Sequence, residues 1–109
     1  MLVWLMLGGA ILLEVVATLS LKASDGLTRW PWIIPVVGGY VGAFVMLSQV
    51  LRLGMRVGTA YATWAGAGVA LTAVLAWVVF GERLTWTMGA GLVLIVAGVA
   101  LVELGGATE

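Results

Sequence analysis

Charged residues are few in this chain and widely spaced, and their spacing limits the folds available to it. A helix of about 20 apolar residues crosses the hydrocarbon core of a bilayer. Three stretches of about that length lack Asp, Glu, Lys and Arg, at residues 30–51, 57–81 and 84–102. A further apolar stretch, residues 2–21, is interrupted only by Glu14. We therefore expect an all-α integral membrane protein with four transmembrane helices, near 2–21, 31–51, 57–80 and 85–104.

Composition excludes several other classes of protein. Charged residues make up 9% of the chain, against about 25% in a typical soluble domain. The net charge is zero and there is no Cys or His, so a nucleic-acid partner, disulfides, and thiol or imidazole chemistry are not expected. We expect one membrane domain over residues 1–109, with no metal or cofactor and no enzymatic activity. Glu14 within the first apolar stretch, with no Lys or Arg before it, argues against a cleaved signal peptide.

The short loops carry an almost balanced positive charge. Lys22, Arg29 and Arg83 fall on one side of the membrane, and Arg52 and Arg56 fall on the other. Lys and Arg in short loops set the orientation of a membrane protein. A difference of one charge does not fix an orientation, so the pattern favours insertion in both directions.

Glu14 is the charged residue in the middle of a predicted span. An ionisable side chain at that depth costs several kcal/mol unless it is paired, hydrated or neutral. The other predicted spans place no Lys or Arg at the same depth, so we expect a mobile counter-ion, either a proton or a substrate cation. Leu7, Ala10 and Thr18 share the helical face of Glu14 and are candidate binding residues. The alternative is a protonated Glu14 that only joins helices.

Aromatic residues supply a second part of a cation site. Tyr40 and Phe44 are one turn apart in the second predicted helix, and Tyr61 and Trp64 share a face of the third. Aromatic faces attract cations and bind flat apolar surfaces. Together with a carboxylate, these side chains predict a site for hydrophobic cations, although aromatic residues also serve as packing or interface anchors.

Glycines are spaced for close helix packing. Gly38 and Gly42 form a GxxxG pair in the second helix, and Gly91 and Gly98 lie seven residues apart in the fourth. Small residues let membrane helices approach closely. The fourth helix carries no other chemical groups on that face, which favours a dimer contact at Gly91 and Gly98.

Several of these segments together resemble one family. The chain is similar to small multidrug resistance transporters in the segments Gly8–Val15, Gly58–Trp64, Gly81–Leu84 and Gly91–Val99. The resemblance implies a proton-coupled antiporter in a bacterial inner membrane. It would export hydrophobic, aromatic or quaternary ammonium cations.

The resemblance also implies an assembly and residue roles. Two copies would form an antiparallel homodimer, with the fourth helices in contact at Gly91, Gly98 and Val99. Glu14 would bind protons and substrate in turn. Tyr61, Trp64 and Tyr40 would contact the substrate.

Other functions stay open from the sequence. The guanidinium-exporting branch of the family typically has a Trp three residues after the membrane Glu. Here that position is Ala17, followed by Thr18, which resembles the multidrug branch. Guanidinium export is the closest alternative. A rotor proteolipid of an ion-driven ATP synthase or a structural membrane subunit are more distant ones.

Overall fold

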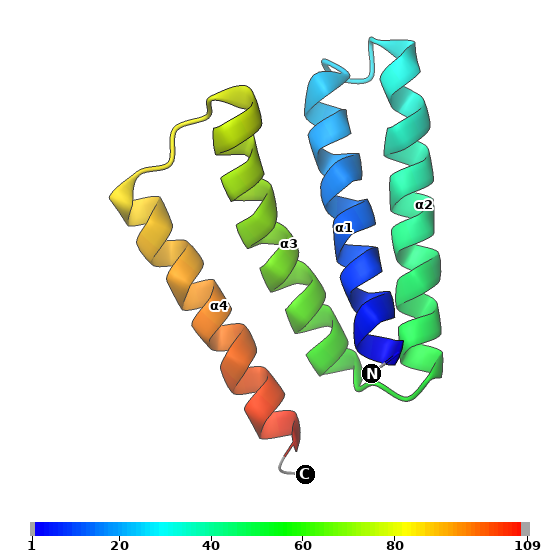
Figure 1. The fold of residues 1–109 in the computed structure, drawn as a ribbon, viewed down its shortest axis with the longest axis vertical. Helices are drawn as coiled ribbons and strands as arrows, with labels where there is room; N and C mark the ends of the chain where they lie inside the picture. The colour runs from blue at the N-terminus through cyan, green and yellow to red at the C-terminus, as the bar shows by residue number, and fades with distance from the viewer. Residues whose placement is uncertain (1, 108–109) are drawn as a thin grey trace. The chain divides into compact units, whose positions relative to one another are not determined.

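Four α-helices make up the part of the chain that the computed structural model describes, residues 2–107. All four are long and apolar enough to cross a membrane, which confirms the expected all-α membrane fold. The helices are α1 (Leu2–Ala23), α2 (Trp30–Arg52), α3 (Val57–Phe80) and α4 (Trp86–Ala107) (Figure 1).

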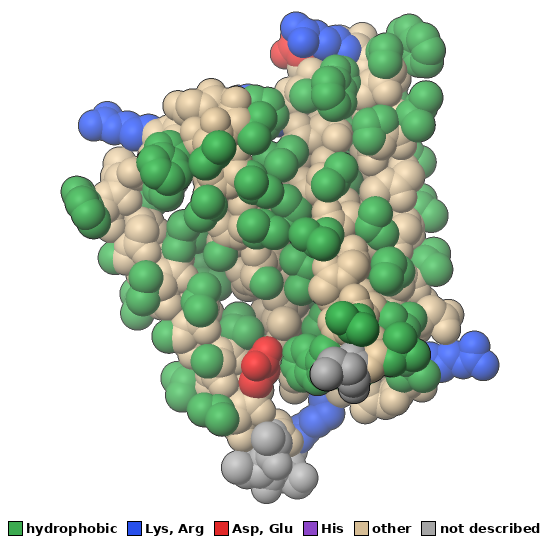
Figure 2. Space-filling view, viewed as in Figure 1, with side chains coloured by type: hydrophobic (Ala, Val, Ile, Leu, Met, Phe, Trp, Pro, Cys, Tyr) green, Lys and Arg blue, Asp and Glu red, His purple; other side chains and the backbone are tan. Residues whose placement is uncertain are grey.

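The helices carry apolar side chains on their outer surfaces. In Figure 2, apolar side chains cover the lengths of the helices, and the visible charged side chains lie towards the helix ends. Leu94 and Leu101 are 73% and 69% exposed. A helix satisfies its own backbone hydrogen bonds, so such a surface is stable in lipid, whose tails are as apolar as leucine.

Helices α1 and α2 form an antiparallel hairpin (Figure 1), which is the first of two compact units that divide after Gly54. The helices are closest at Gly39. A Cβ placed there would lie 2.8 Å from the Ala17 Cβ and 2.9 Å from the Leu13 carbonyl oxygen. A Cβ at Gly42 would likewise lie 3.1 Å from the Leu13 Cδ1. The two backbones therefore approach closely enough to exclude any side chain at position 39.

This contact differs from the expected Gly38 and Gly42 pair. A Cβ at Gly38 would meet nothing within 4 Å. Successive helix residues are rotated by about 100°, so only one of the neighbours Gly38 and Gly39 faces α1.

The turn between α1 and α2 is held by Ser24. Its hydroxyl donates to the Leu21 carbonyl at 2.7 Å and accepts from the Leu27 N–H at 2.9 Å. Asp25, Gly26 and Leu27 all have positive φ, as the Asp25-Gly26 turn signal suggests. The turn is therefore tight, and α2 begins with Pro31 in its first turn, where a missing N–H costs nothing.

Helices α3 and α4 form the second hairpin (Figure 1). Helix α3 ends at Gly81, whose φ of 68° is left-handed, a conformation that favours glycine. A Cβ at Gly66 would overlap the Val99 side chain, and one at Gly106 would lie 3.0 Å from the Thr59 hydroxyl. Among the described residues, α4 has no buried side chain, so this hairpin is packed less closely than the first.

Candidate functional site

Glu14 lies in the middle of α1, inside a membrane-spanning segment. Its Oε1 accepts a long hydrogen bond of 3.4 Å from the Thr18 hydroxyl. Its Oε2 is buried and has no hydrogen-bond partner among the residues that the structure describes. A buried polar atom without a partner is costly, so this oxygen is suited to bind a proton or a cation.

Thr18 and Tyr40 connect Glu14 to α2. The Thr18 hydroxyl donates to the Glu14 carbonyl at 2.9 Å and lies 2.8 Å from the Tyr40 hydroxyl. A hydroxyl has one proton to donate. When Thr18 donates to Glu14, Tyr40 must therefore donate to Thr18. The result is a directional chain of hydrogen bonds from Tyr40 through Thr18 to the Glu14 main-chain carbonyl, with the Glu14 carboxyl as a longer alternative acceptor.

The closeness of α1 and α2 makes this chain possible. Gly39 precedes Tyr40 and touches Ala17, which precedes Thr18. Ala17 is fully buried. Because no side chain separates the backbones here, the Tyr40 hydroxyl reaches Thr18 directly. The sequence analysis did not predict Gly39 as a contact residue. Its position next to Tyr40, a predicted site residue, could have indicated it.

The other predicted residues of the first unit lie near this chain or along its helices. Leu7 and Ala10 extend the face of Glu14 towards the start of α1, and both are buried. Phe44 lies one turn after Tyr40 in α2 and is exposed. The structure thus joins Glu14, Thr18 and Tyr40 by hydrogen bonds, with Leu7 and Ala10 on the same helix face.

Tyr61 and Trp64 belong to the second unit and form an aromatic pair. Their ring centroids are 5.9 Å apart and the planes are tilted by 54°, a favourable geometry for two aromatic rings. Tyr61 is 60% exposed, whereas Trp64 is half-buried. The pair therefore offers an accessible aromatic surface on α3.

The predicted dimer residues lie on α4. A Cβ at Gly91 or Gly98 would meet nothing within 4 Å, whereas the Val99 side chain lies against Gly66 of the same hairpin. Gly91 and Gly98 therefore mark a stripe on α4 with open space beside it.

A second carboxyl within the spans was not singled out from the sequence. The Thr63 hydroxyl donates to Glu103 Oε1 at 2.9 Å, joining α3 to α4. In the part of the chain that the structure describes, no group of three Asp, Glu, His or Cys residues could hold a metal ion.

Comparison with known proteins identifies the family. The family model for the Small Multidrug Resistance protein matches residues 2–95. The chain belongs to the small multidrug resistance family. This confirms the resemblance in the sequence.

Three relatives show the range of names within the small multidrug resistance family. The quaternary ammonium compound-resistance protein QacF of Klebsiella aerogenes is 45% identical over 93% of this chain and 91% of the relative. The spermidine export protein MdtI of Klebsiella pneumoniae strain 342 is 44% identical, over 87% of this chain and 86% of the relative. The multidrug transporter EmrE of Escherichia coli K12 is 41% identical, over 93% and 91%.

These three small multidrug resistance relatives are named for transport, export or resistance, and none of the three is named as an enzyme. Four apolar spans and membership of this family make the chain a multi-pass membrane protein.

Proposed function

We propose that this protein exchanges protons for hydrophobic or quaternary ammonium cations at Glu14. The observation that carries the proposal is the Glu14 carboxyl itself. It lies within a span, and its buried Oε2 has no hydrogen-bond partner among the described residues. A carboxylate in that position must be neutralised by a proton or by a cation.

Competition for one carboxyl produces exchange. A protonated Glu14 has no charge with which to hold a cation, so proton binding on one side of the membrane releases the cation there. Loss of the proton on the other side restores cation binding. One pH unit supplies about 1.4 kcal/mol per proton, and 100 mV supplies about 2.3 kcal/mol per net charge moved.

Tyr40 and Thr18 prepare the carboxyl for this exchange. The Thr18 hydroxyl, held by Tyr40, lies 3.4 Å from Oε1, and Oε2 is left for the ligand.

The preference for hydrophobic cations is supported by the Tyr61 and Trp64 pair. A quaternary ammonium ion has no N–H to donate, so it gains from aromatic faces and from the charge of a carboxylate. The relative QacF is named for resistance to such compounds. The guanidinium branch typically has Trp at position 17. Here that residue is the small Ala17, which packs against Gly39.

The functional unit that we propose is an antiparallel homodimer in a bacterial inner membrane. Loop charges of three against two permit both orientations. The open stripe at Gly91 and Gly98 suits a contact between two α4 helices, whereas the neighbouring Val99 side chain already packs against Gly66 of the same hairpin. Gly98→Leu fills this stripe. We expect it to reduce chemical cross-linking between copies in the membrane, whereas Gly89→Leu should not.

Calorimetric titration of the purified protein with tetraphenylphosphonium tests the function directly. We expect binding to weaken as the pH falls from 9 to 5, with protons released on binding when buffers of different ionisation enthalpy are compared. Glu14→Gln should abolish this pH dependence. Glu82→Gln is the matched control, because Glu82 is exposed between α3 and α4. Binding that is equally tight at every pH would contradict the proposal.

Spermidine is a second candidate substrate, because the relative MdtI is named for its export. Its primary ammonium groups can donate hydrogen bonds to Glu14 Oε2. Competition of spermidine and of guanidinium against tetraphenylphosphonium separates these substrates. Displacement by spermidine at comparable concentrations would favour a polyamine exporter.

A further inference from the structure

The hydrogen bond between Thr63 and Glu103 is a side-chain link between two membrane helices. The Thr63 hydroxyl and Glu103 Oε1 are 2.9 Å apart, and both residues lie inside membrane-spanning segments. Hydrogen bonds between side chains of neighbouring membrane helices stabilise their association. The function proposed above, centred on Glu14, gives this second carboxyl no role.

The link lies on the face of α3 that contacts α4. Thr59, Thr63 and Gly66 follow one another at spacings of four and three residues, which place them on one helical face. Thr59 lies close to Gly106, Thr63 binds Glu103, and Gly66 lies against Val99. This face is therefore attached to α4 over about two turns.

The aromatic pair lies on the other side of the same helix. Successive residues of an α-helix are rotated by about 100°, so Trp64 and Tyr61 lie about 100° and about 160° around the axis from Thr63. Any rotation of α3 against α4 therefore changes the direction of both rings.

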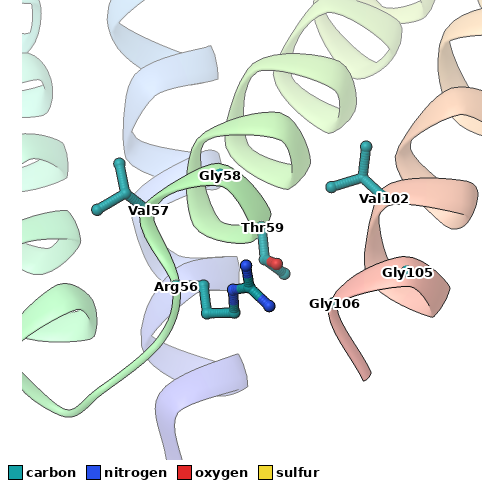
Figure 3. A pocket seen from close by; sticks show the side chains of 7 residues that line it. All are labelled: Arg56, Val57, Gly58, Thr59, Val102, Gly105 and Gly106. Carbon is teal, nitrogen blue, oxygen red and sulfur yellow. The ribbon is translucent and has the colours of Figure 1, made fainter. Parts of the chain in front are cut away.

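Two hollows border the contact between α3 and α4. A hollow of about 390 Å³ lies at one end of the hairpin, where the Arg56 and Thr59 side chains extend towards Gly106 and Val102 (Figure 3). A second hollow of about 380 Å³ borders Ala70 and Val96. Apolar contacts such as Gly66 with Val99 are non-directional, whereas a hydrogen bond fixes an angle.

We propose that Glu103 is a positioning residue that sets the rotation of α3 through Thr63, and thereby the direction of Trp64 and the preference for aromatic cations. The proposal rests on the function proposed above in so far as Trp64 contacts the substrate. The carboxyl acts here as a hydrogen-bond acceptor, and its negative charge is not required.

Substitutions at Glu103 and Thr63 separate the hydrogen bond from the charge. Thr63→Val and Glu103→Leu both remove the bond, whereas Glu103→Gln keeps an acceptor oxygen and removes the charge. Thr59→Val is the matched control, since it changes a threonine one turn earlier on the same face. Each variant is titrated with tetraphenylphosphonium, which is aromatic, and with tetrapropylammonium, which is not.

We expect Thr63→Val and Glu103→Leu to lower the affinity for tetraphenylphosphonium roughly fivefold, because a cation–π contact is misaligned. The affinity for tetrapropylammonium should fall less than about twofold. The double variant should lose no more than either single variant, since both remove one interaction. Glu103→Gln and Thr59→Val should stay within about twofold of wild type. If Glu103→Gln behaves like Glu103→Leu, the charge matters and the positioning role is wrong.

Trp64 fluorescence provides a readout that does not depend on cation binding. In a chain where the other five tryptophans are replaced by Phe, acrylamide quenching of Trp64 should change with Thr63→Val and not with Glu103→Gln. Unchanged quenching and an unchanged ligand ratio in Thr63→Val would overturn the positioning role. If cation binding by the wild type does not depend on pH, the proposed exchange at Glu14 is wrong. The quenching of Trp64 would still decide the role of Glu103.

Discussion

The two hairpins use the same pair of residue types in opposite ways. In the first, Thr18 binds Glu14 within one helix, and Glu14 Oε2 keeps no partner among the described residues. In the second, Thr63 binds Glu103 across two helices. The helices of the first hairpin are joined by backbone contact at Gly39 and by the Thr18–Tyr40 hydrogen bond, so Glu14 is not needed to link them. The closely packed hairpin thus leaves an oxygen of its carboxyl without a partner among the described residues, whereas the loosely packed hairpin uses its carboxyl to join two helices.

Neutralising each carboxyl in turn tests most directly whether Glu14 and Glu103 have different roles. We expect Glu14→Gln to weaken tetraphenylphosphonium binding at pH 8 at least about 30-fold, because losing one charge of a buried pair costs about 2–5 kcal/mol. Glu103→Gln should leave the affinity within about twofold. Calorimetry on both variants measures the difference. Equal losses would show that the two carboxyls have the same role.

Adding one methyl group to each hairpin tests the difference in packing. Gly39→Ala should destabilise the protein by about 1–3 kcal/mol, because the new Cβ meets the Leu13 backbone oxygen, which cannot move aside. Gly66→Ala should cost less, because it meets only side chains of Val99 and Ile95, on a helix with no buried side chain among the described residues that can shift as a whole. Thermal unfolding in detergent measures both.

The control for the packing test is Gly38→Ala, whose Cβ meets nothing within 4 Å. It should leave the unfolding temperature unchanged or raise it, since alanine favours helix. A loss of stability in Gly38→Ala as large as that in Gly39→Ala would contradict the close contact at Gly39.

Removing an aromatic ring measures how much the second hairpin contributes to cation binding. Trp64→Ala should lower the affinity for tetraphenylphosphonium roughly tenfold or more, because a desolvated cation–π contact contributes about 2 kcal/mol. The affinity for tetrapropylammonium should fall less. Trp77→Ala, on the same helix and near its end, should change neither. A loss for Trp64→Ala that is equal for both ligands would show that Trp64 only packs.

The smallest expected effect concerns the hydrogen-bond chain of the first hairpin. Tyr40→Phe removes the hydroxyl that binds Thr18. We expect a roughly fivefold loss of cation affinity, since one such bond contributes about 0.5–1.5 kcal/mol. Thr18→Val should lower the affinity at least as much, because it also removes the bond to Glu14. Ser48→Ala, which loses only a bond to its own helix, is the control in the same titration.

Much of the fold could be predicted from the spacing of charges alone. Bilayer thickness fixes the length of a span, so stretches without charge translate directly into helices. Glu14 and Thr18 could be placed together because one helical turn separates them. These predictions depend only on local geometry and on the solvent.

Contacts between helices could not be predicted in the same way. Whether Gly38 or Gly39 faces α1 depends on the rotation of α2 about its axis. A helix that is apolar on all sides has no polar face from which this rotation could be predicted. Glu103 follows the last uncharged stretch and is the second-last residue of the predicted span 85–104, so the sequence gives no partner for it. The structure continues α4 to Ala107 and pairs Glu103 with a residue 40 positions earlier.

The chain of hydrogen bonds around Glu14 also has a consequence for how the protein is made. All of its members lie before Gly54, so they leave the ribosome before α3 and α4. Once α2 enters the membrane, Glu14 has Thr18 and, through it, Tyr40 beside it. These hydrogen bonds of Glu14 therefore need no residue from the second half of the chain.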